Sequence, residues 1–530
     1  SWGKSADRNY SEEQWNAIVS YYKVLEKKAE ESQKHQFVDD ITWNDLDMDE
    51  VYQVWNHTRT SIGEEYLYAA LRRPIASDAE MEERERVITY LLENTQERMY
   101  LQEALAEIGK LERMSVYDHL ELIKDMKPIG ALPHILAGVC LVGALIGCAF
   151  APEFMVIASI VIMGGNIISY YQAKAKVDSY IRLFTFILHM VEQCEGVARK
   201  KIPGLEKYQD QLKKQTSCFG KYRRFCFLVN GGSGMSGDIM DSLMDYIRIL
   251  FHVDLVKMST MIREAKKYEQ QLRIMYDTIG YLDTMLSTAS CRIMYGEYCV
   301  PQLSHQANGK FAVTEMYHPL IPEGVRNSIT AERSVLLTGS NASGKSTFIK
   351  TVALNAILAQ TLHTVLAENY QASWFCIASS MALRDDILSQ ESYYIVEIRS
   401  LKRILDLTRS SELPVLCFID EVLRGTNTVE RIAASSRILQ AIAEQGGLCF
   451  AATHDIELTY LLEKEYDNYH FEEQVEDDKV TFDYGLREGR ACTRNAIRLL
   501  KMLGYDEKIV DDANERVALF LKSGNWVSSH

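Results

Sequence analysis

The sequence predicts an α/β domain preceded by an all-helical region that carries an apolar helical hairpin. Three observations support this prediction. From about residue 300, short apolar runs typical of buried strands alternate with helical stretches, as in a doubly wound sheet. Before residue 300, apolar residues recur mainly at the spacing of amphipathic helices. Residues 128–173 are almost devoid of charge, unlike the regions on either side.

The composition bounds the class of protein. The chain has 530 residues, 47% of them hydrophobic, which is enough for several domains with a sizeable core. Its formal net charge of −15 argues against a protein that coats nucleic acid over its whole surface, although a local basic patch remains compatible. The eleven cysteines contain no C-x-x-C pair, so we expect reduced thiols rather than a zinc site or disulfides. Because the chain starts with Ser1, we expect a processed or longer protein, with no signal peptide in the printed sequence.

Residues 48–127 predict helices separated by short breaks. Pro74 predicts one such break, before a helix that begins near Ser77. Residues 1–37 are charged and helix-prone, with apolar residues spaced for one packing stripe. The stripe consists of Trp15, Ile18, Tyr22 and Leu25.

Three aspartates, Asp45, Asp47 and Asp49, superficially suggest a calcium loop. We reject that interpretation because Glu50 and Asn56 stand where such a loop needs glycine and glutamate. We expect an acidic helix start instead, since carboxylates there offset the helix dipole.

Residues 128–173 predict an apolar helical hairpin. Two stretches, 130–151 and 154–171, are 22 and 18 residues long and contain no charged residue. At 1.5 Å per residue they would span about 33 Å and about 27 Å, close to the ~30 Å hydrocarbon core of a bilayer. Pro152 and Glu153 lie between them and predict the turn. The cations flank the outer ends of the hairpin at Lys124, Lys127, Lys174, Lys176 and Arg182.

This charge pattern favours a transmembrane hairpin with both ends in the cytoplasm. Gly143 and Gly147 would form a small face against which the second helix packs, and the tyrosines at 170–171 would lie at the membrane interface. The alternative is a buried hairpin in a large soluble core. His134 and Asn166 interrupt the apolar pattern, and we expect them to be interfacial or paired between helices.

Residues 199–224 form a basic stretch, with nine Lys or Arg against Glu206 and Asp210, an excess of seven positive charges. Three interpretations stay open: a solvated helix face, a contact with anionic lipid, and a nucleic-acid patch. The glycine-rich residues 231–237 lack a following Lys-Ser and predict a flexible loop.

Residues 339–346 fit the phosphate-loop motif G-x-x-x-x-G-K-S, between a predicted buried strand at 335–337 and a predicted helix at 348–361. The glycines let backbone N–H groups face the phosphates, and the helix N-terminus adds partial positive charge. Lys345 would reach the β- and γ-phosphates, and the Ser346 hydroxyl would bind Mg²⁺. The predicted nucleotide-binding residues are Gly339, Ser340, Asn341, Ala342, Ser343, Gly344, Lys345, Ser346 and Thr347.

Two further predicted strands end in residues suited to nucleotide hydrolysis. The apolar run 415–419 is followed by Asp420, which would hold Mg²⁺ through water, and by Glu421, which would orient and polarise the attacking water. The run 449–453 is followed by His454, which would face the ligand crevice and sense the γ-phosphate. The predicted catalytic residues are therefore Glu421, His454 and Lys345.

Together these motifs resemble the ATPase domain of the MutS family of DNA mismatch repair proteins. The resemblance is very specific over about 301–515 and weaker over 46–120. It rests on segments in the family's order: 338–347 with Asn341, 392–397, 420–428 and 452–458, with His318-Pro319 ahead of them, a last hairpin at 482–489 and a helix-turn-helix dimerisation segment at 496–513. Residues 58–67 and 71–74 resemble the start of the family's helical core and lever.

The resemblance implies an ABC-type P-loop ATPase that uses ATP and Mg²⁺ and forms a homodimer with two composite sites. Ser392 would then reach the partner's γ-phosphate, whereas the residues alone indicate an ordinary helix start. Residues 424–428 would lie at the dimer interface. The domains would be an N-terminal helical segment at 1–45, core-like helices at 46–127, the hairpin at 128–173, lever-like helices at 174–300, the ATPase domain at 301–515 and a tail at 516–530.

Departures from the family shape the functional hypothesis. The printed sequence contains no recognisable mismatch-reading, clamp or nuclease domain. We therefore expect a membrane-anchored, dimeric, ATP-driven switch with a cytoplasmic ATPase domain and an unknown protein partner, rather than a classical mismatch repair enzyme. The alternative is a DNA-binding MutS-type repair or recombination protein that recognises mismatched, branched or single-stranded DNA. A third hypothesis is a scaffold whose assembly ATP controls.

Overall fold

The structure is a computed structural model, and its described part divides into two compact units. It describes residues 2, 10–31, 37–111, 114–125, 130–175, 178–219, 246–306, 309–340, 343–381, 393–423, 427–476, 479–491, 497, 500 and 504–523. The helical unit comprises residues 1–34, 55–70 and 83–294, and the α/β unit comprises 35–54, 71–82 and 295–530. Residues 35–54 and 71–82 thus group with the α/β domain, across the domain boundaries expected from the sequence.

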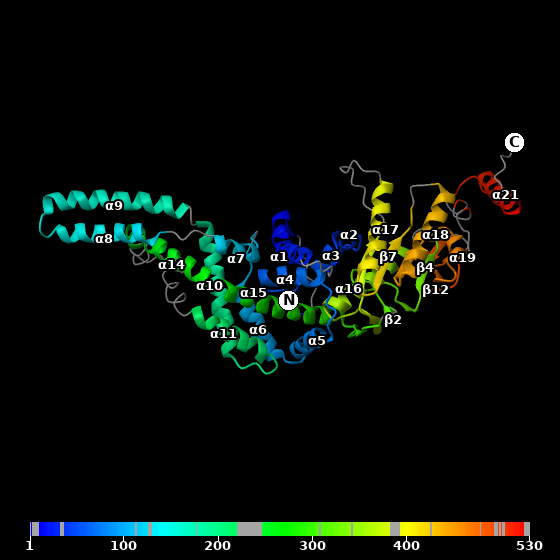
Figure 1. Ribbon diagram of the computed structural model, residues 1–530, viewed down its shortest axis with the longest axis horizontal. Helices are drawn as coiled ribbons and strands as arrows, with labels where there is room; N and C mark the ends of the chain where they lie inside the picture. Colours follow the sequence, from blue (N-terminus) through cyan, green and yellow to red (C-terminus); the bar gives the residue numbers. More distant parts are fainter. Residues whose placement is uncertain are drawn as a thin grey trace. The chain divides into compact units, whose positions relative to one another are not determined.

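The helical unit is built from helices, as the apolar spacing predicts (Figure 1). Ile18 and Tyr22 of the predicted N-terminal stripe are buried in it. Its helices are α1 (Glu12–Glu31), α4 (Ser61–Arg72), α5 (Asp78–Glu93), α6 (Thr95–Ile108), α7 (Val116–Asp125), α8 (Ala131–Gly147), α9 (Pro152–Ala175), α10 (Asp178–Arg199), α11 (Glu206–Thr216), α14 (Val253–Lys267) and α15 (Glu269–Tyr295), with a 3₁₀ turn at Ser217–Phe219. Helices α4 and α5 run across the boundary between the units.

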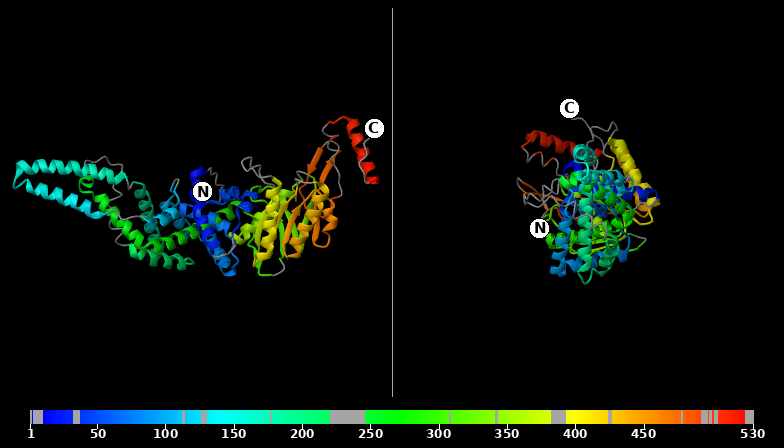
Figure 2. Two further views of the ribbon diagram at one scale, coloured as in Figure 1. Left: turned by 45° about the horizontal axis from the view of Figure 1, so that its top comes forward. Right: turned by 90° about the vertical axis from the view of Figure 1, so that its left-hand side faces the viewer.

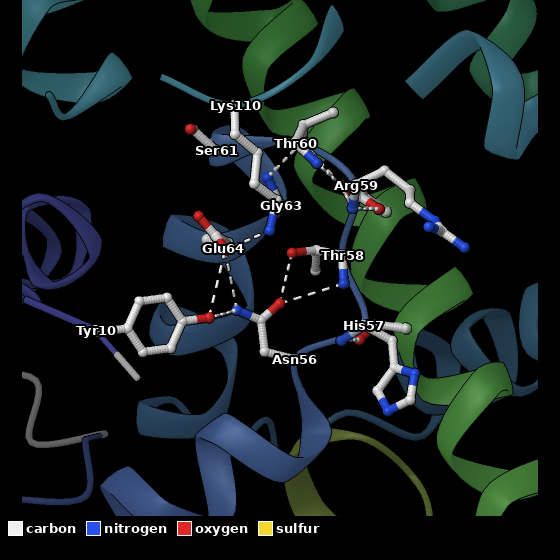
Figure 3. Close-up of polar contacts among 12 residues, drawn as sticks. Tyr10, Asn56, His57, Thr58, Arg59, Thr60, Ser61, Gly63, Glu64 and Lys110 are labelled. Atoms are coloured by element: carbon white, nitrogen blue, oxygen red, sulfur yellow. Dashed lines mark hydrogen bonds and ion pairs between the residues drawn. The ribbon is translucent and has the colours of Figure 1, made fainter. Parts of the chain in front are cut away.

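Buried polar side chains fix the start of α4, in the segment that resembles the MutS core (Figure 3). Asp283 of α15 accepts hydrogen bonds from the backbone N–H of Thr60 at 2.9 Å and from its hydroxyl at 2.7 Å, which satisfies donors at the helix start. Asn56 Nδ2 donates to the Tyr10 hydroxyl at 2.6 Å and to Glu64 Oε1 at 3.3 Å. These contacts connect the segment before α1, the start of α4 and the middle of α15.

Helices α8 and α9 lie side by side as an antiparallel hairpin (Figures 1 and 2). The expected turn at Pro152 is wrong by a few residues: the turn occupies 148–151, and Pro152 is the first residue of α9, where its missing N–H costs no helical hydrogen bond. The expected packing of α9 against Gly143 and Gly147 is correct for Gly147 and wrong for Gly143. A Cβ at Gly147 would lie 3.0 Å from Met155 of α9, whereas a Cβ at Gly143 would have nothing within 4 Å.

The two polar exceptions in the hairpin are paired between helices, as expected. Asn166 Nδ2 donates to the carbonyl of Ala137 at 3.2 Å and to that of Leu250 at 2.9 Å. His134 Nδ1 lies 2.9 Å from His252 Nδ1, at the start of α14.

One helix in the described part of the chain, Pro152–Lys174, is long and apolar enough to cross a membrane by length and composition, with a mean hydropathy of 1.7. Helix α8 is apolar but shorter, at 17 residues. The expectation of two segments of spanning length therefore holds for α9 and is wrong for α8, because the chain leaves the helix at Gly147.

The α/β unit is organised around a six-stranded sheet with the order β12-β9-β4-β8-β7-β6. Strands β9, β4, β8, β7 and β6 are parallel, and β12 is an antiparallel edge strand. A second sheet has the order β1-β5-β2-β3, and β10 pairs with β11. The strands are β1 (Gln302–Ser304), β2 (Phe311–Met316), β3 (Asn327–Ala331), β4 (Ser334–Thr338), β5 (Asn369–Ser373), β6 (Cys376–Ser380), β7 (Val415–Asp420), β8 (Leu448–Ala452), β9 (Tyr466–His470), β10 (Glu473–Glu476), β11 (Lys479–Phe482) and β12 (Arg487–Glu488).

Fully apolar strands give this sheet two buried faces. All residues of β4, β7 and β8 are buried, which is typical of a parallel sheet covered on both sides. Cys417 and Ile419 share a core cluster with Leu439 of helix α18 (Thr428–Glu444), while Phe418 stacks on Phe450, whose ring lies edge-on to that of Phe311 in β2. The helices of this unit are α2 (Asp40–Asp45), α3 (Met48–Trp55), α16 (Lys345–Thr361), α17 (Tyr393–Ser410), α18 (Thr428–Glu444), α19 (Leu458–Leu461) and α21 (Glu507–Ser523).

The acidic segment at 45–49 has roles that its sequence did not indicate. Asp49 lies in the first turn of α3, as an acidic helix start requires. Asp45 instead accepts from Ser379 Oγ at 2.6 Å and from the backbone N–H of Met381 at 2.9 Å. Asp47 forms an ion pair with Lys350 of α16 at 2.6 Å. The interpretation as a helix start is wrong for Asp45, the last residue of α2, whereas Asp47 directly precedes the first residue of α3.

The C-terminal expectation also changes. The hairpin expected at 482–489 lies earlier, between β10 and β11, and residues 487–488 pair with β9 as strand β12. Of the segment 496–513, the structure describes residues 497, 500 and 504–513, and α21 covers 507–523.

Candidate active site

The predicted site residues lie where three neighbouring parallel strands end. Leu337 of β4 and Asp420 of β7 both pair in register with Ala452 of β8, so these ends are level with one another. In an open α/β sheet, ligands bind at the carboxyl ends of such strands. The loop after Thr338 therefore meets Glu421 and His454 at one edge.

The phosphate loop is held in a left-handed backbone that requires glycine. Gly344 has φ +103° and precedes α16 as its N-cap, and a Cβ there would lie 3.1 Å from Tyr484. Gly339 has φ +146°, and a Cβ there would lie 2.8 Å from the carbonyl oxygen of Phe471. The loop thus places the N-terminus of a 17-residue helix, with its partial positive charge, toward the site.

Lys345 is buried and contacts its own loop. Its Nζ donates to the carbonyl oxygens of Gly339 and Ser340, each at 2.8 Å. Ser340 Oγ donates to Glu473 at 2.8 Å. Bound phosphate would offer the ammonium group stronger, charged acceptors than these carbonyls.

Glu421 and His454 form a pair beside the loop. His454 Nε2 lies 3.0 Å from Glu421 Oε1. The strand β8 ends at Ala452, so His454 follows two residues after the strand rather than at its last position. The histidine can thereby orient the carboxylate that the sequence assigned to water activation.

A cavity of about 480 Å³ adjoins the loop. It is lined by Ser343, Gly344, Lys345, Ser346 and Thr347, by Glu421, and by residues from elsewhere in the unit that include His318, Phe471 and Tyr484. Gly339, Ser340, Asp420 and His454 are not among the lining residues.

The sequence motifs missed the aromatic and imidazole lining of this cavity. Phe471 carries no local motif, and Tyr484 lies in the segment 482–489, which the resemblance marked only as a hairpin. His318 was noted through the family resemblance alone. Burial lowers its pKa to about 4, with Lys350 acting in the same direction, so the ring is neutral at pH 7. Its Nδ1 accepts from the backbone N–H of Leu320 at 3.1 Å, which requires that neutral form.

Two buried oxygen atoms fit a nucleotide with its metal ion. Within the described ranges, Ser343 Oγ and Asp420 Oδ1 are buried without a hydrogen-bond partner. A buried acceptor or hydroxyl without a partner is costly, and a bound ligand would supply one. The described residues contain no group of three or more His, Cys, Asp or Glu suited to a metal. Mg²⁺ would therefore depend on nucleotide phosphates and water together with Ser346 and Asp420.

Several predicted residues lie outside the described part of the chain. These are Asn341, Ala342, Ser392 and residues 424–426. Their predicted roles stay predictions.

Comparison with known proteins links this site to one family. Residues 335–520 match the family model described as MutS domain V. The chain is 25% identical to the DNA mismatch repair protein MutS of Streptococcus sanguinis over 516 residues, which cover 88% of this chain and 59% of that protein. It is 31% identical to MutS of Natronomonas pharaonis over 45% of this chain and 28% of that protein. With MutS of Pseudothermotoga lettingae the identity is 32%, over 45% of this chain and 30% of that protein.

The chain spans at most about 59% of the length of these three relatives. The matched segment contains the phosphate loop and the strand end at Asp420 and Glu421. It also contains nearly all residues of the six-stranded sheet. Residues 335–520 are therefore a MutS domain V, the P-loop ATPase domain of the MutS family.

Proposed function

We propose that this chain hydrolyses ATP and uses the cycle as a conformational switch, working as a dimer with two composite sites. The observation that carries the proposal is the shared cavity: Lys345, Ser346 and Glu421 line it together at the carboxyl ends of parallel strands. A phosphate-binding cation, a metal-binding hydroxyl and a water-activating carboxylate are the groups that phosphoryl transfer to water needs.

Each residue has a defined task in this proposal. Lys345 exchanges its two carbonyl acceptors for the β- and γ-phosphates. Ser346 and Asp420 would hold Mg²⁺, which supplies charge neutralisation at the phosphate oxygens when bound. Glu421 orients water and accepts its proton, while His454 fixes the Glu421 carboxylate through the 3.0 Å contact and senses the γ-phosphate. Ser392 would complete the partner's site.

Substitution of Lys345 tests nucleotide binding. Lys345→Ala removes the ammonium group, so ATP affinity should fall by at least ~100-fold, as loss of a charge-assisted contact in a buried site predicts. Lys402→Ala is the matched control, because Lys402 is 72% exposed on α17 and pairs with Asp406. Fluorescence titration with an ATP analogue measures both. Unchanged affinity in Lys345→Ala would contradict the proposal.

We propose DNA as the macromolecule on which the switch acts. The relatives compared above are named DNA mismatch repair proteins, and this favours the DNA-binding hypothesis over a switch without DNA. Lys213 and Lys214 lie exposed in the last turn of α11 and fit a phosphate contact. Arg223 and Arg224 lie outside the described residues.

Binding to mismatched and four-way-junction DNA at several salt concentrations tests this proposal. Replacing Lys213 and Lys214 by Gln should weaken binding uniformly across sequences and reduce the salt slope by about two. Lys27→Gln with Lys28→Gln on α1 supplies a control pair of neighbouring lysines. No DNA binding at low salt would leave a switch that acts on something else.

A second proposal concerns location, and it rests on the surface of α9. Only 17% of its most apolar 18-residue window is buried, whereas a core helix would be mostly buried. Exposed side chains such as Ile157, Ile160 and Val161 suit lipid. We propose that the hairpin holds the protein at a membrane, with the ATPase domain in the cytoplasm. Fractionation of cells expressing the full chain tests this: extraction by detergent but not carbonate would support it, and recovery without detergent would refute it.

A further inference from the structure

The backbone that carries Glu421 adopts a conformation that side chains disfavour. The angle φ is +56° at Glu421 and +58° at Leu423. Both lie in the left-handed region, where a Cβ crowds the backbone, and neither residue is glycine. Such conformations persist where the surroundings fix them. The contacts of this loop therefore decide where the Glu421 carboxylate points.

Each residue of the described loop 421–423 makes a hydrogen bond through its backbone. The N–H of Glu421 donates to the carbonyl of Ala452 at 3.0 Å. The carbonyl of Val422 accepts from Ser435 Oγ at 3.3 Å. The N–H of Leu423 donates to the side-chain carboxyl oxygen Oε1 of Glu397. The last contact comes from a helix, α17, and fixes the second left-handed residue.

Glu397 is unusual for its burial. It is 8% exposed, whereas the other acidic residue of α17, Asp406, is 52% exposed and pairs with Lys402. Burying a carboxyl group is costly unless it is hydrogen-bonded, and the Leu423 N–H supplies one such bond, to Oε1. Leu423 itself belongs to the same buried core cluster as Leu401 and Ile404 of α17. Movement of α17 must therefore move the loop.

Helix α17 begins at Tyr393, directly after Ser392, the residue predicted to reach the partner's γ-phosphate. Glu397 is the fifth residue of the helix, about 6 Å along its axis from the first. We propose that Glu397 is a positioning residue for ATP hydrolysis, which fixes the Leu423 backbone and so transmits the position of α17 to Glu421. This inference rests on the proposed function, because it concerns the same ATPase site.

Three substitutions of Glu397 in the full-length chain separate positioning from stability. Glu397→Gln keeps a carbonyl oxygen that can accept from Leu423, so kcat should stay within about threefold of the unmodified chain. Glu397→Asp keeps the charge but is one methylene shorter, and Glu397→Ala removes the acceptor. For these two, kcat should fall by roughly 30-fold or more, since misplacement near 1 Å has such effects. ATP affinity should change by less than about threefold in all three.

Asp406→Ala on the exposed face of α17 is the matched control and should leave kcat and ATP affinity unchanged. If Glu397→Ala does not fold, the order of the Gln and Asp variants decides. A higher kcat for Glu397→Asp than for Glu397→Gln would overturn the proposal. The charge of the side chain, and not its length, would then determine kcat. Full activity of the Ala variant would overturn it as well. Either of these two results would overturn the role of Glu397 alone, provided that Glu421→Ala is inactive. Hydrolysis of ATP by Glu421→Ala would instead contradict the proposed function.

Discussion

Gly344 shows how single residues shape the phosphate loop. Its φ of +103° lies in the region that an L side chain disfavours, and Tyr484 stands 3.1 Å from where a Cβ would lie. Gly344→Ala should therefore distort the loop and lower ATP affinity about tenfold or more, since left-handed strain of 1–2 kcal/mol falls on the binding backbone.

Gly446→Ala is the matched control for that substitution. Gly446 has φ +82° and open space around its Cβ position. It should lower stability to a similar extent while leaving ATP affinity unchanged. Titration of both variants with ATP checks this, and equal affinities would show that the loop tolerates the strain.

The buried carboxyl group of Glu65 makes the free energy of unfolding depend on pH. Burial raises its pKa from 4.5 to about 8, although Tyr276 and two backbone N–H groups favour its charged form. The folded chain thus keeps a proton that the unfolded chain releases between these values. Its stabilising contribution is complete below pH 4.5 and is lost as the pH rises through about 8.

Glu65→Gln removes this titration, because Gln stays neutral. Between pH 6 and pH 8, the unmodified chain should lose ~2 kcal/mol of unfolding free energy more than the variant does. Glu82→Gln, at an exposed position of α5, should keep the original slope. Urea denaturation at both pH values measures the difference, and parallel slopes for Glu65→Gln and the unmodified chain would disprove it.

At the residue scale, short motifs predicted residues that the structure places close together. The loop residues, Glu421 and His454 were found from short patterns because glycine, lysine and strand-end carboxylates must occur at fixed spacing. Tyr484 and Glu397 could not be assigned in this way. Their contacts with Gly344 and Leu423 arise from the fold, which joins residues 140 and 26 positions apart.

At the element scale, helix α16 is tied to the turn between α2 and α3 within the α/β unit. Lys350 of α16 and Asp47 form their ion pair at 2.6 Å with both side chains mostly buried, at 28% and 25% exposure. A double-mutant cycle with Lys350→Ala and Asp47→Ala should give a coupling of about 0.5–1 kcal/mol, because partial burial reduces screening by solvent.

The pair Lys402–Asp406 offers the comparison for this cycle, with exposures of 72% and 52%. Its coupling should be about 0.3 kcal/mol, as for exposed pairs one helical turn apart. Urea unfolding supplies both values. A coupling for Lys350 and Asp47 no larger than that of the exposed pair would contradict the assignment.

Sequence patterns located the elements but not their ends or partners. The apolar runs of β4, β7 and β8 and the stripe of α1 were predicted, since burial imposes their composition. The hairpin turn moved to 148–151 because alanine, glycine and cysteine are compatible with helix and turn alike. The roles of Asp45 and Asp47 depend on partners 334 and 303 residues away, which no local pattern encodes.

At the scale of the whole molecule, the chain is two compact units whose segments interleave. Residues 35–54 and 71–82 contribute to the α/β unit although the sequence grouped them with helices. Linear domain boundaries could not predict this, because the chain enters and leaves each unit more than once. Helices α3, α4 and α5 each contain residues of both units.

The most direct test of the central claim is ATP binding and turnover by Glu421→Ala in the full-length chain. The loop, Lys345 and Ser346 remain, so the variant should bind ATP with affinity within about threefold of the unmodified chain. Without the carboxylate that activates water, steady-state hydrolysis should fall by at least ~100-fold, the scale of general-base catalysis. Undiminished hydrolysis by Glu421→Ala would contradict the account.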